Sequence, residues 1–258
     1  YLACVAFVDH QVGVILNSLE NSQYAENTIV IFTADHGYHM GEKNFLSKTT
    51  IWEESTRVPF VVYAPGVSVA GEKVAHPISL IDLYPTLIDL SALPQNPNLA
   101  GNGHHLDGHS IRPFLENPAS GTWNGPPVAL NHLHGKVTPA NDTPSPIEDN
   151  HHSVRSNRYR YTLTSDGKEE FYDHLNDPNE WTNLAMTDLD DDERSLMEWH
   201  KLELLKLLNI SALHINNPTK SPKFNLYQSY SGASNRTTKI EYTLSKETQV
   251  SIEVYDVN

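Results

Sequence analysis

The sequence predicts an α/β fold in which a mostly parallel sheet is flanked by helices. Two short apolar runs rich in β-branched residues, 28–33 and 58–64, are typical of strands buried on both faces. A segment with helical periodicity precedes the first run, at 2–19, and another follows the second run, at 79–90. This order of helix, strand, loop, strand and helix is the rhythm of an α/β sheet domain.

Local signals support the two helices. In the first, apolar residues recur at spacings of three and four and therefore share one helix face, beginning with Leu2, Val5 and Val8. At the start of the second, Ser79 and Asp82 have the spacing of a capping box, with Asp in place of Glu or Gln.

The composition divides the chain further. Residues 94–150 are rich in Pro, Gly, Asn and His and are expected to be irregular, so 1–150 is assigned to one α/β domain. Residues 151–214 are predicted to form a small antiparallel β subdomain with a C-terminal helix. Its expected elements are a strand at 153–164, a turn at Asp166-Gly167, a returning strand at 170–172 and a helix at 191–208. A polar linker at 215–225 is expected to precede a partial β-rich domain at 226–258. Apolar residues alternate with polar ones at 240–244 and 250–254, which predicts a half-buried strand at each.

Charge and composition narrow the classes of function. The 258 residues include 18 Lys and Arg against 32 Asp and Glu, a net charge of −14, which argues against a general nucleic-acid binder. The longest uninterrupted apolar stretch, 1–8, is shorter than the ~20 residues of a membrane helix, so no membrane span is expected. The single cysteine, Cys4, excludes an intrachain disulfide and is expected to be a packed thiol.

Asp35 and His36 follow the first predicted strand and precede Gly37. Ligands of open α/β sheets bind outside the carboxyl ends of strands, so this Asp-His pair is a candidate cation site. The alternative is that Asp35 caps a turn and His36 lies on the surface. Lys48, twelve residues after His36, could neutralise an anionic ester in the same cleft, or it could be a solvated surface lysine.

The stretch 34–60, ADHGYHMGEKNFLSKTTIWEESTRVPF, resembles the C-terminal half of the type I sulfatase signature. The iduronate-2-sulfatase-like and choline-sulfatase-like branch is the most similar. Further segments agree in family order, and they are 1–19, 78–94, 106–115 and 153–184. The resemblance implies the C-terminal portion of an alkaline phosphatase-like fold.

The resemblance also implies a sulfatase that depends on Ca²⁺ and on formylglycine. In the family, calcium holds the sulfate ester and a formylglycine hydrate, made from Cys or Ser, attacks sulfur. Asp35 and His36 match the second pair of metal-site residues. His36 is the weaker match, because calcium prefers oxygen ligands, and it could instead bind a sulfate oxygen. Lys48 matches the sulfate-binding lysine.

Substrate-binding residues are expected in two regions. The resemblance places His39 and Lys43 in a substrate-facing loop, where relatives often carry His at the position of Lys43. His152 and Arg155 are the pair expected to contact the sugar or its anionic groups. The alternative for His152 and its neighbours His132, His134 and His151 is that they are exposed polar residues.

The family's nucleophile motif, Cys/Ser-x-Pro-x-Arg, is absent from the sequence, so no nucleophile is assigned. The chain is therefore expected to be a piece of a longer protein and to be inactive alone. The expected substrate is a sulfated polysaccharide or its oligosaccharides. Two alternatives remain open, a phosphodiester or phosphonate hydrolase of the same superfamily and a non-catalytic glycan-binding relative.

The tail 226–258 resembles the start of the C-terminal sorting domain of the type IX secretion system. The motifs that carry the resemblance are Leu226-Tyr227-Gln228, TKIEY at 238–242 and Val254-Tyr255-Asp256. It implies the type IX machinery as a partner, passage through the periplasm, and a secreted or cell-surface location. The alternative is a small β module for adhesion or carbohydrate binding.

Overall fold

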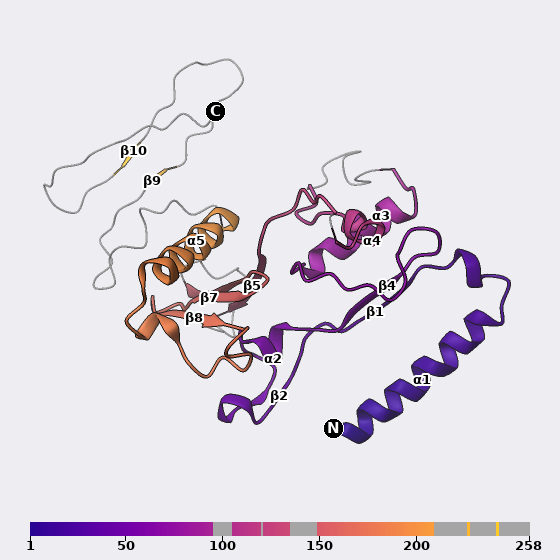
Figure 1. Ribbon diagram of the computed structural model, residues 1–258, viewed down its shortest axis with the longest axis horizontal. Helices are drawn as coiled ribbons and strands as arrows, with labels where there is room; N and C mark the ends of the chain where they lie inside the picture. Colours follow the sequence, from indigo (N-terminus) through magenta and orange to yellow (C-terminus); the bar gives the residue numbers. More distant parts are fainter. Residues whose placement is uncertain (95–104, 120, 135–148, 209–225, 228–240, 243–258) are drawn as a thin grey trace, which may run out of the picture. The chain divides into compact units, whose positions relative to one another are not determined.

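The computed structural model describes residues 1–94, 105–119, 121–134 and 149–208, together with 226–227 and 241–242 (Figure 1). The chain divides into two compact units, 1–210 and 211–258. The first part of unit 1 contains α1 (Leu2–Glu20), β1 (Val30–Thr33), β2 (His39–Met40), β3 (Leu46–Ser47), α2 (Glu53–Thr56), β4 (Phe60–Tyr63), α3 (Leu83–Leu90) and α4 (Arg112–Glu116). Its second part contains β5 (Ala129–His134), β6 (Asn150–Arg155), β7 (Tyr159–Leu163), β8 (Glu169–Asp173) and α5 (Asp191–Leu207).

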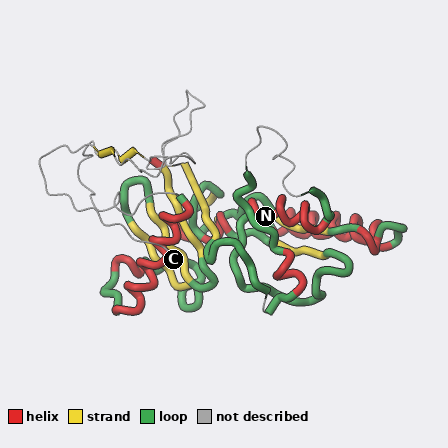
Figure 2. The backbone as a smooth tube through the Cα atoms, turned by 90° about the horizontal axis from the view of Figure 1, so that it is seen from above, coloured by secondary structure: helices red, strands yellow, loops and turns green. Residues whose placement is uncertain are grey.

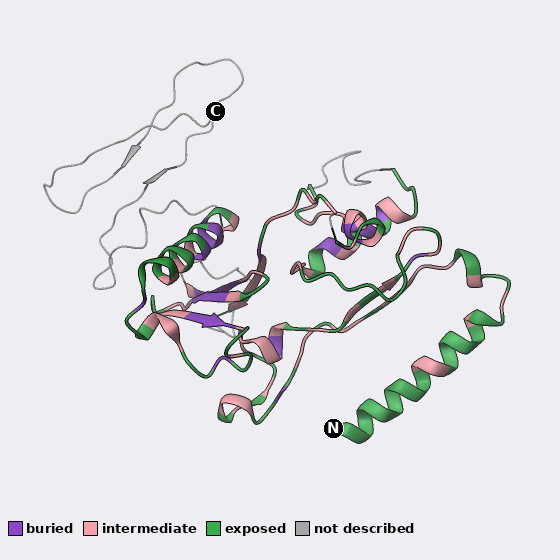
Figure 3. Cartoon of the chain, in the orientation of Figure 1, coloured by how far each residue is buried: buried purple, intermediate pink, exposed green. Residues whose placement is uncertain are grey.

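The predicted N-terminal helix is confirmed as α1, but none of its residues is buried (Figure 3). Cys4 is exposed on it, so the expectation of a packed thiol is wrong. Apolar side chains of α1 face those of β1 and β4 across an apolar groove of about 910 Å³, whose lining includes Val12, Phe32 and Val61.

By length and composition, α1 is the one helix in the described part of the chain that could cross a membrane. Its mean hydropathy reaches 1.5, although the core helix of a soluble protein passes the same test. The length of the uninterrupted apolar stretch, 1–8, underestimates the length of this apolar helix. Asp9 and His10 interrupt the stretch, but the helix continues to Glu20.

The strands β1 and β4 pair antiparallel, from Val30 opposite Tyr63 to Thr33 opposite Phe60. The prediction of a mostly parallel sheet is therefore wrong for the described residues, whose strand pairs are all antiparallel. Two parallel strands require a crossover, usually a helix, and the α-helix between β1 and β4, α2, is only four residues long. Two apolar runs in a sequence predict two strands, but they do not distinguish parallel from antiparallel pairing.

The predicted capping box is confirmed. The side chain of Asp82 accepts a hydrogen bond from the Ser79 N–H (2.8 Å) at the start of a 3₁₀ turn, Leu80–Asp82, that leads into α3. The prediction that 94–150 is irregular is wrong for α4 and for β5. Strand β5 forms because all six of its residues pair with β6, a long-range contact that composition does not reveal.

The small subdomain is a four-stranded antiparallel sheet in the order β5-β6-β7-β8, seen with its strands side by side in Figure 2. The predicted strand 153–164 is two strands, because the chain turns back where the Ser156 N–H donates to the Tyr159 carbonyl (2.9 Å). The predicted turn at Gly167 is confirmed, and its φ of 79° is one that glycine adopts without strain.

Helix α5 covers this sheet by packing on β6 and β7. The core between them consists of Val128, Val154, Tyr161, Phe171 and Leu204, each fully buried. Helix α5 starts with a capping box between Asp190 and Glu193. The helix predicted at 191–208 is thus confirmed to within one residue.

In unit 2, β9 (Leu226–Tyr227) and β10 (Glu241–Tyr242) pair antiparallel. Strand β10 falls within the strand predicted around 240–244. The predicted linker at 215–225 and the predicted strand at 250–254 lie outside the described residues.

Candidate active site

The candidate site begins directly after β1, where the chain turns toward α2. The Gly37 N–H donates to the Ser55 carbonyl (2.8 Å). A Cβ atom on Gly37 would lie 1.9 Å from the Glu54 carbonyl oxygen, so only glycine fits here. This close approach fixes the position of the preceding residues, Asp35 and His36.

His36 and Lys48 are in direct contact. The Lys48 ammonium donates to His36 Nε2 at 2.7 Å, and the His36 Nδ1–H donates to the Gly37 carbonyl at 2.8 Å. This arrangement corresponds to the neutral imidazole with its lone pair on Nε2. Asp35 Oδ2 lies 3.5 Å from the same nitrogen. The structure therefore brings together the three residues that the sequence predicts at one cleft.

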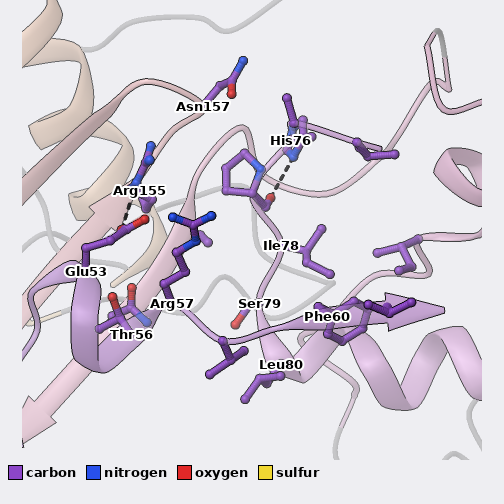
Figure 4. Close-up of a pocket in the computed structure, with 18 of the residues that line it drawn as sticks. Glu53, Thr56, Arg57, Phe60, His76, Ile78, Ser79, Leu80, Arg155 and Asn157 are labelled. Atoms are coloured by element: carbon purple, nitrogen blue, oxygen red, sulfur yellow. Dashed lines mark hydrogen bonds and ion pairs between the residues drawn. The ribbon is translucent and has the colours of Figure 1, made fainter. Parts of the chain in front are cut away.

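Asp35, His36 and Lys48 line a cavity of about 1230 Å³. Arg57, in the loop after α2, and Arg155, at the end of β6, line it as well (Figure 4). The four-stranded sheet and the loops around β1 and β4 thus contribute cationic side chains to one cavity. Such a cavity suits an anionic ligand.

Two predicted substrate-binding residues do not line this cavity. His39 is fully buried, with Nε2 2.8 Å from Thr50 Oγ1. The Lys43 ammonium lies over the rings of Trp52 and Tyr172, at 4.6 and 4.7 Å from their centroids. In this arrangement both residues hold the loop together.

The other predicted pair is split between the cavity and the sheet. Arg155 lines the cavity, and its Nε–H donates to Glu53 Oε2 at 3.2 Å. His152 is only 3% exposed, and its Nδ1 lies 3.2 Å from that of His132. His132, in turn, is one of the residues that line the cavity.

An ion-pair network next to the cavity is missing from the sequence prediction. The fully buried Arg160 contacts Glu53 Oε2 at 2.5 Å and Glu180 Oε1 at 2.7 Å, and His174 Nε2 lies 3.0 Å from Glu180 Oε1. Glu53 and Arg160 are 107 positions apart in sequence, so no local pattern links them. Burial raises the pKa of Glu53, but the charges of Arg160 and Arg155 outweigh it and hold that pKa below its usual range.

Glu53, His174 and Glu180 have ligand atoms within 4.8 Å of one another, which is compatible with a metal ion. Arg160 and Arg155 already balance the two carboxylates, however. We therefore interpret this group as an ion-pair network that ties α2 to the four-stranded sheet.

Calcium fits the predicted site only in part. The Asp35 carboxylate is 87% exposed and suits an ion that prefers oxygen ligands. The Nε2 lone pair of His36 accepts a hydrogen bond from Lys48 instead. One carboxylate is far short of the about 6–8 oxygens that surround calcium, so further ligands are needed.

The comparisons with known proteins define the class. Residues 1–92 match the family model described as Sulfatase, and the described residues adopt a mixed α/β fold found in solved sulfatase structures. The chain therefore carries a sulfatase-family domain of the alkaline phosphatase-like superfamily. Because the match includes α1, we interpret α1 as a helix of that domain and not as a membrane span.

The relatives that it resembles include both sulfatases and a phosphonate hydrolase. The chain is 36% identical over 187 residues to a sulfatase of Formosa agariphila, which covers 72% of this chain and 32% of the relative. The phosphonate monoester hydrolase of Agrobacterium radiobacter superposes with a TM-score of 0.66 at 28% identity, over 80% of this chain and 40% of that one. A 2-O GAG sulfatase gives 0.60 at 28% identity, over 78% and 40%. The chain spans about a third of the length of the curated relatives it matches.

The close approach at Gly37 gives a first prediction. Gly37→Ala should lower the free energy of unfolding by about 1–3 kcal/mol, because the added methyl group forces Glu54 and its neighbours to move. Urea unfolding measures this loss. Gly13→Ala is the matched control, since a Cβ atom there meets nothing within 4 Å. Equal stability of the two variants would contradict the packing argument.

Proposed function

We propose that this chain is part of a sulfuric ester hydrolase that acts on a sulfated polysaccharide or its oligosaccharides. The contact of Lys48 with His36 beside Asp35, on the wall of a cation-lined cavity, carries the proposal. The sequence identity with the Formosa agariphila sulfatase and the structural similarity to a 2-O GAG sulfatase support the proposal. The assignment to the iduronate-2-sulfatase-like and choline-sulfatase-like branch rests on the motif in 34–60.

Each residue of the site has a role in this proposal. The Lys48 ammonium binds a sulfate oxygen, and His36 holds that ammonium in place through its Nε2 lone pair. Asp35 supplies one carboxylate to Ca²⁺, and calcium, when bound, neutralises charge on the sulfate group. Arg155, which lines the same cavity, binds anionic groups of the sugar. Contacts of His39, Lys43 and His152 with substrate stay predictions.

The proposed nucleophile is a formylglycine in a part of the protein outside residues 1–258. The absence of Cys/Ser-x-Pro-x-Arg from this sequence supports this proposal. The chain also spans only about a third of the length of its relatives, which leaves room for the motif elsewhere. Residues 1–258 alone should therefore release no sulfate from a chromogenic aryl sulfate with calcium present. The longer protein that carries this chain should release it. Sulfate release by purified residues 1–258 would place a nucleophile within them.

The likeness to a phosphonate monoester hydrolase favours a second candidate function. Parallel assays of the longer protein on an aryl sulfate and on an aryl phosphonate monoester separate the two, because the sulfatase proposal requires the higher kcat/KM on the sulfate. Binding of sulfated oligosaccharide without hydrolysis of either ester would indicate the non-catalytic glycan-binding relative.

We further propose that 226–258 belongs to a sorting domain read by the type IX secretion machinery, which exports the protein through the periplasm to the cell surface or medium. The pairing of β9 with β10 supports a β-rich tail. Deletion of 226–258 should retain the protein inside a bacterium that has this machinery, as measured by immunoblots of cells and medium.

A further inference from the structure

Three histidines of the four-stranded sheet lie on one face of two adjacent strands. His132 of β5 is directly opposite His152 of β6, and His134 lies two residues beyond His132. Because side chains alternate between the two faces of a sheet, this register places all three imidazoles on the same face. His151, the neighbour of His152, is on the other face.

The spacing of the first pair is that of two ligands on one metal ion. The Nδ1 atoms of His132 and His152 are 3.2 Å apart. In a tetrahedral zinc site, Zn–N bonds of 2.0–2.1 Å place two ligand nitrogens about 3.3 Å apart. The two rings therefore need almost no rearrangement to bind one ion, once the proton that they share is released.

His134 is placed as a third ligand. Its Nδ1 lies 3.3 Å from Asn150 Oδ1, and because a carbonyl oxygen only accepts, the ring donates there and keeps its lone pair on Nε2. Metal-binding histidines are commonly oriented in this way by a hydrogen bond from the other ring nitrogen. The ring centroids of His134 and His132 are 5.2 Å apart, so the exposed His134 side chain has to turn from its present position to complete the site with the pair.

Charge and access are both suitable for a cation. A histidine side chain is mostly in its neutral, metal-binding form at neutral pH, and the side chain of His132 is exposed. His132 lines the 1230 Å³ cavity, through which an ion can reach it.

We propose that His132, His152 and His134 bind a divalent transition-metal ion of the zinc type. Three imidazoles suit such an ion and not calcium, so this site is distinct in chemistry from Asp35. Lys48 and His132 line the same cavity, and the bound ion therefore adds positive charge to the cavity proposed to bind an anionic substrate.

Calorimetric titration of the metal-free full chain with Zn²⁺ tests the proposal. We expect a single ion per chain, and His132→Asn and His152→Asn should each weaken its binding by at least about tenfold. His151→Asn is the matched control. It removes an imidazole from the same strand, but from the face where the Ser165 N–H donates to His151 Nδ1 (3.2 Å), and it should leave the affinity unchanged.

The experiment also has outcomes that overturn the proposal. His132 is exposed, so its variant should remain folded, and circular dichroism verifies this. Unchanged zinc affinity in folded His132→Asn rejects the site. Loss of binding in His174→Asn, with His132→Asn unaffected, rejects it in favour of the group formed by Glu53, His174 and Glu180. Neither result depends on sulfatase activity, so each is independent of the proposed function.

Discussion

Lys48→Ala should reduce the turnover of sulfate esters by the longer protein roughly 10²–10³-fold, the scale of losing one preorganised electrostatic group. The Lys48 ammonium is preorganised because it donates a hydrogen bond to His36 Nε2 at 2.7 Å, and His36 is itself fixed by its hydrogen bond to the Gly37 carbonyl. Developing negative charge on the sulfate therefore meets a cation that does not need to be reoriented. Steady-state kinetics on an aryl sulfate measures the effect.

Lys73→Ala is the matched control for this experiment. Lys73 lines the same cavity and is exposed, so its truncation removes an equal charge without breaking a contact to His36. Its kcat/KM should change little. Both variants should fold, because each side chain projects from an exposed loop position. A Lys48→Ala enzyme with unaltered kcat/KM would show that this lysine is a bystander.

Local sequence signals predict much of this site. The strand end before Asp35, the glycine at position 37 and the spacing to Lys48 are all readable along the chain. The structure adds the reason for Gly37, which is the close approach of the Glu54 carbonyl. Helix α5 and the turn at Gly167 are likewise predictable, since their signals lie within a few residues of one another.

Long-range pairing is what the sequence does not reveal. The antiparallel register of β1 and β4 depends on the path of the loop between them, and apolar runs carry no information about that path. His132 faces His152 only because β5 pairs with β6 across residues 135–148, which lie outside the described part. Arg160 and Glu53 are 107 positions apart, so no local pattern joins them.

Arg160 connects the four-stranded sheet to the segment that carries the site. Its guanidinium donates to the Ile51 carbonyl (3.2 Å) and to Thr56 Oγ1 (2.9 Å), at the two ends of the α2 region. The same region accepts the Gly37 N–H through Ser55, next to His36. The buried network thus fixes α2 on the sheet, and α2 in turn fixes the loop of His36.

Arg160→Met should therefore lower the free energy of unfolding by about 3–5 kcal/mol, the cost of removing one partner of a buried ion pair.

The stability loss should also depend on pH. Burial raises the pKa of Glu180, but the hydrogen bond from His174 and the charge of Arg160 outweigh it and hold the pKa low. In the parent, this depressed pKa contributes stability above the unfolded carboxyl pKa, which is lost as pH falls through the folded value. In the variant, His174 and Arg155 still oppose the effect of burial but Arg160 no longer does, so the carboxyl pKa values rise. Protonation then relieves buried charge more readily, and the difference in stability between parent and variant should narrow on acidification.

Urea unfolding at neutral and at acidic pH measures both effects. Arg158→Met is the matched control, because Arg158 is 44% exposed in its pair with Asp173, and exposed pairs contribute only about 0–1 kcal/mol. Adding Glu180→Gln to Arg160→Met should restore part of the stability, because it removes a buried carboxylate that has lost its arginine partner. A loss as small as that of Arg158→Met, independent of pH, would mean that Arg160 does not hold α2 on the sheet.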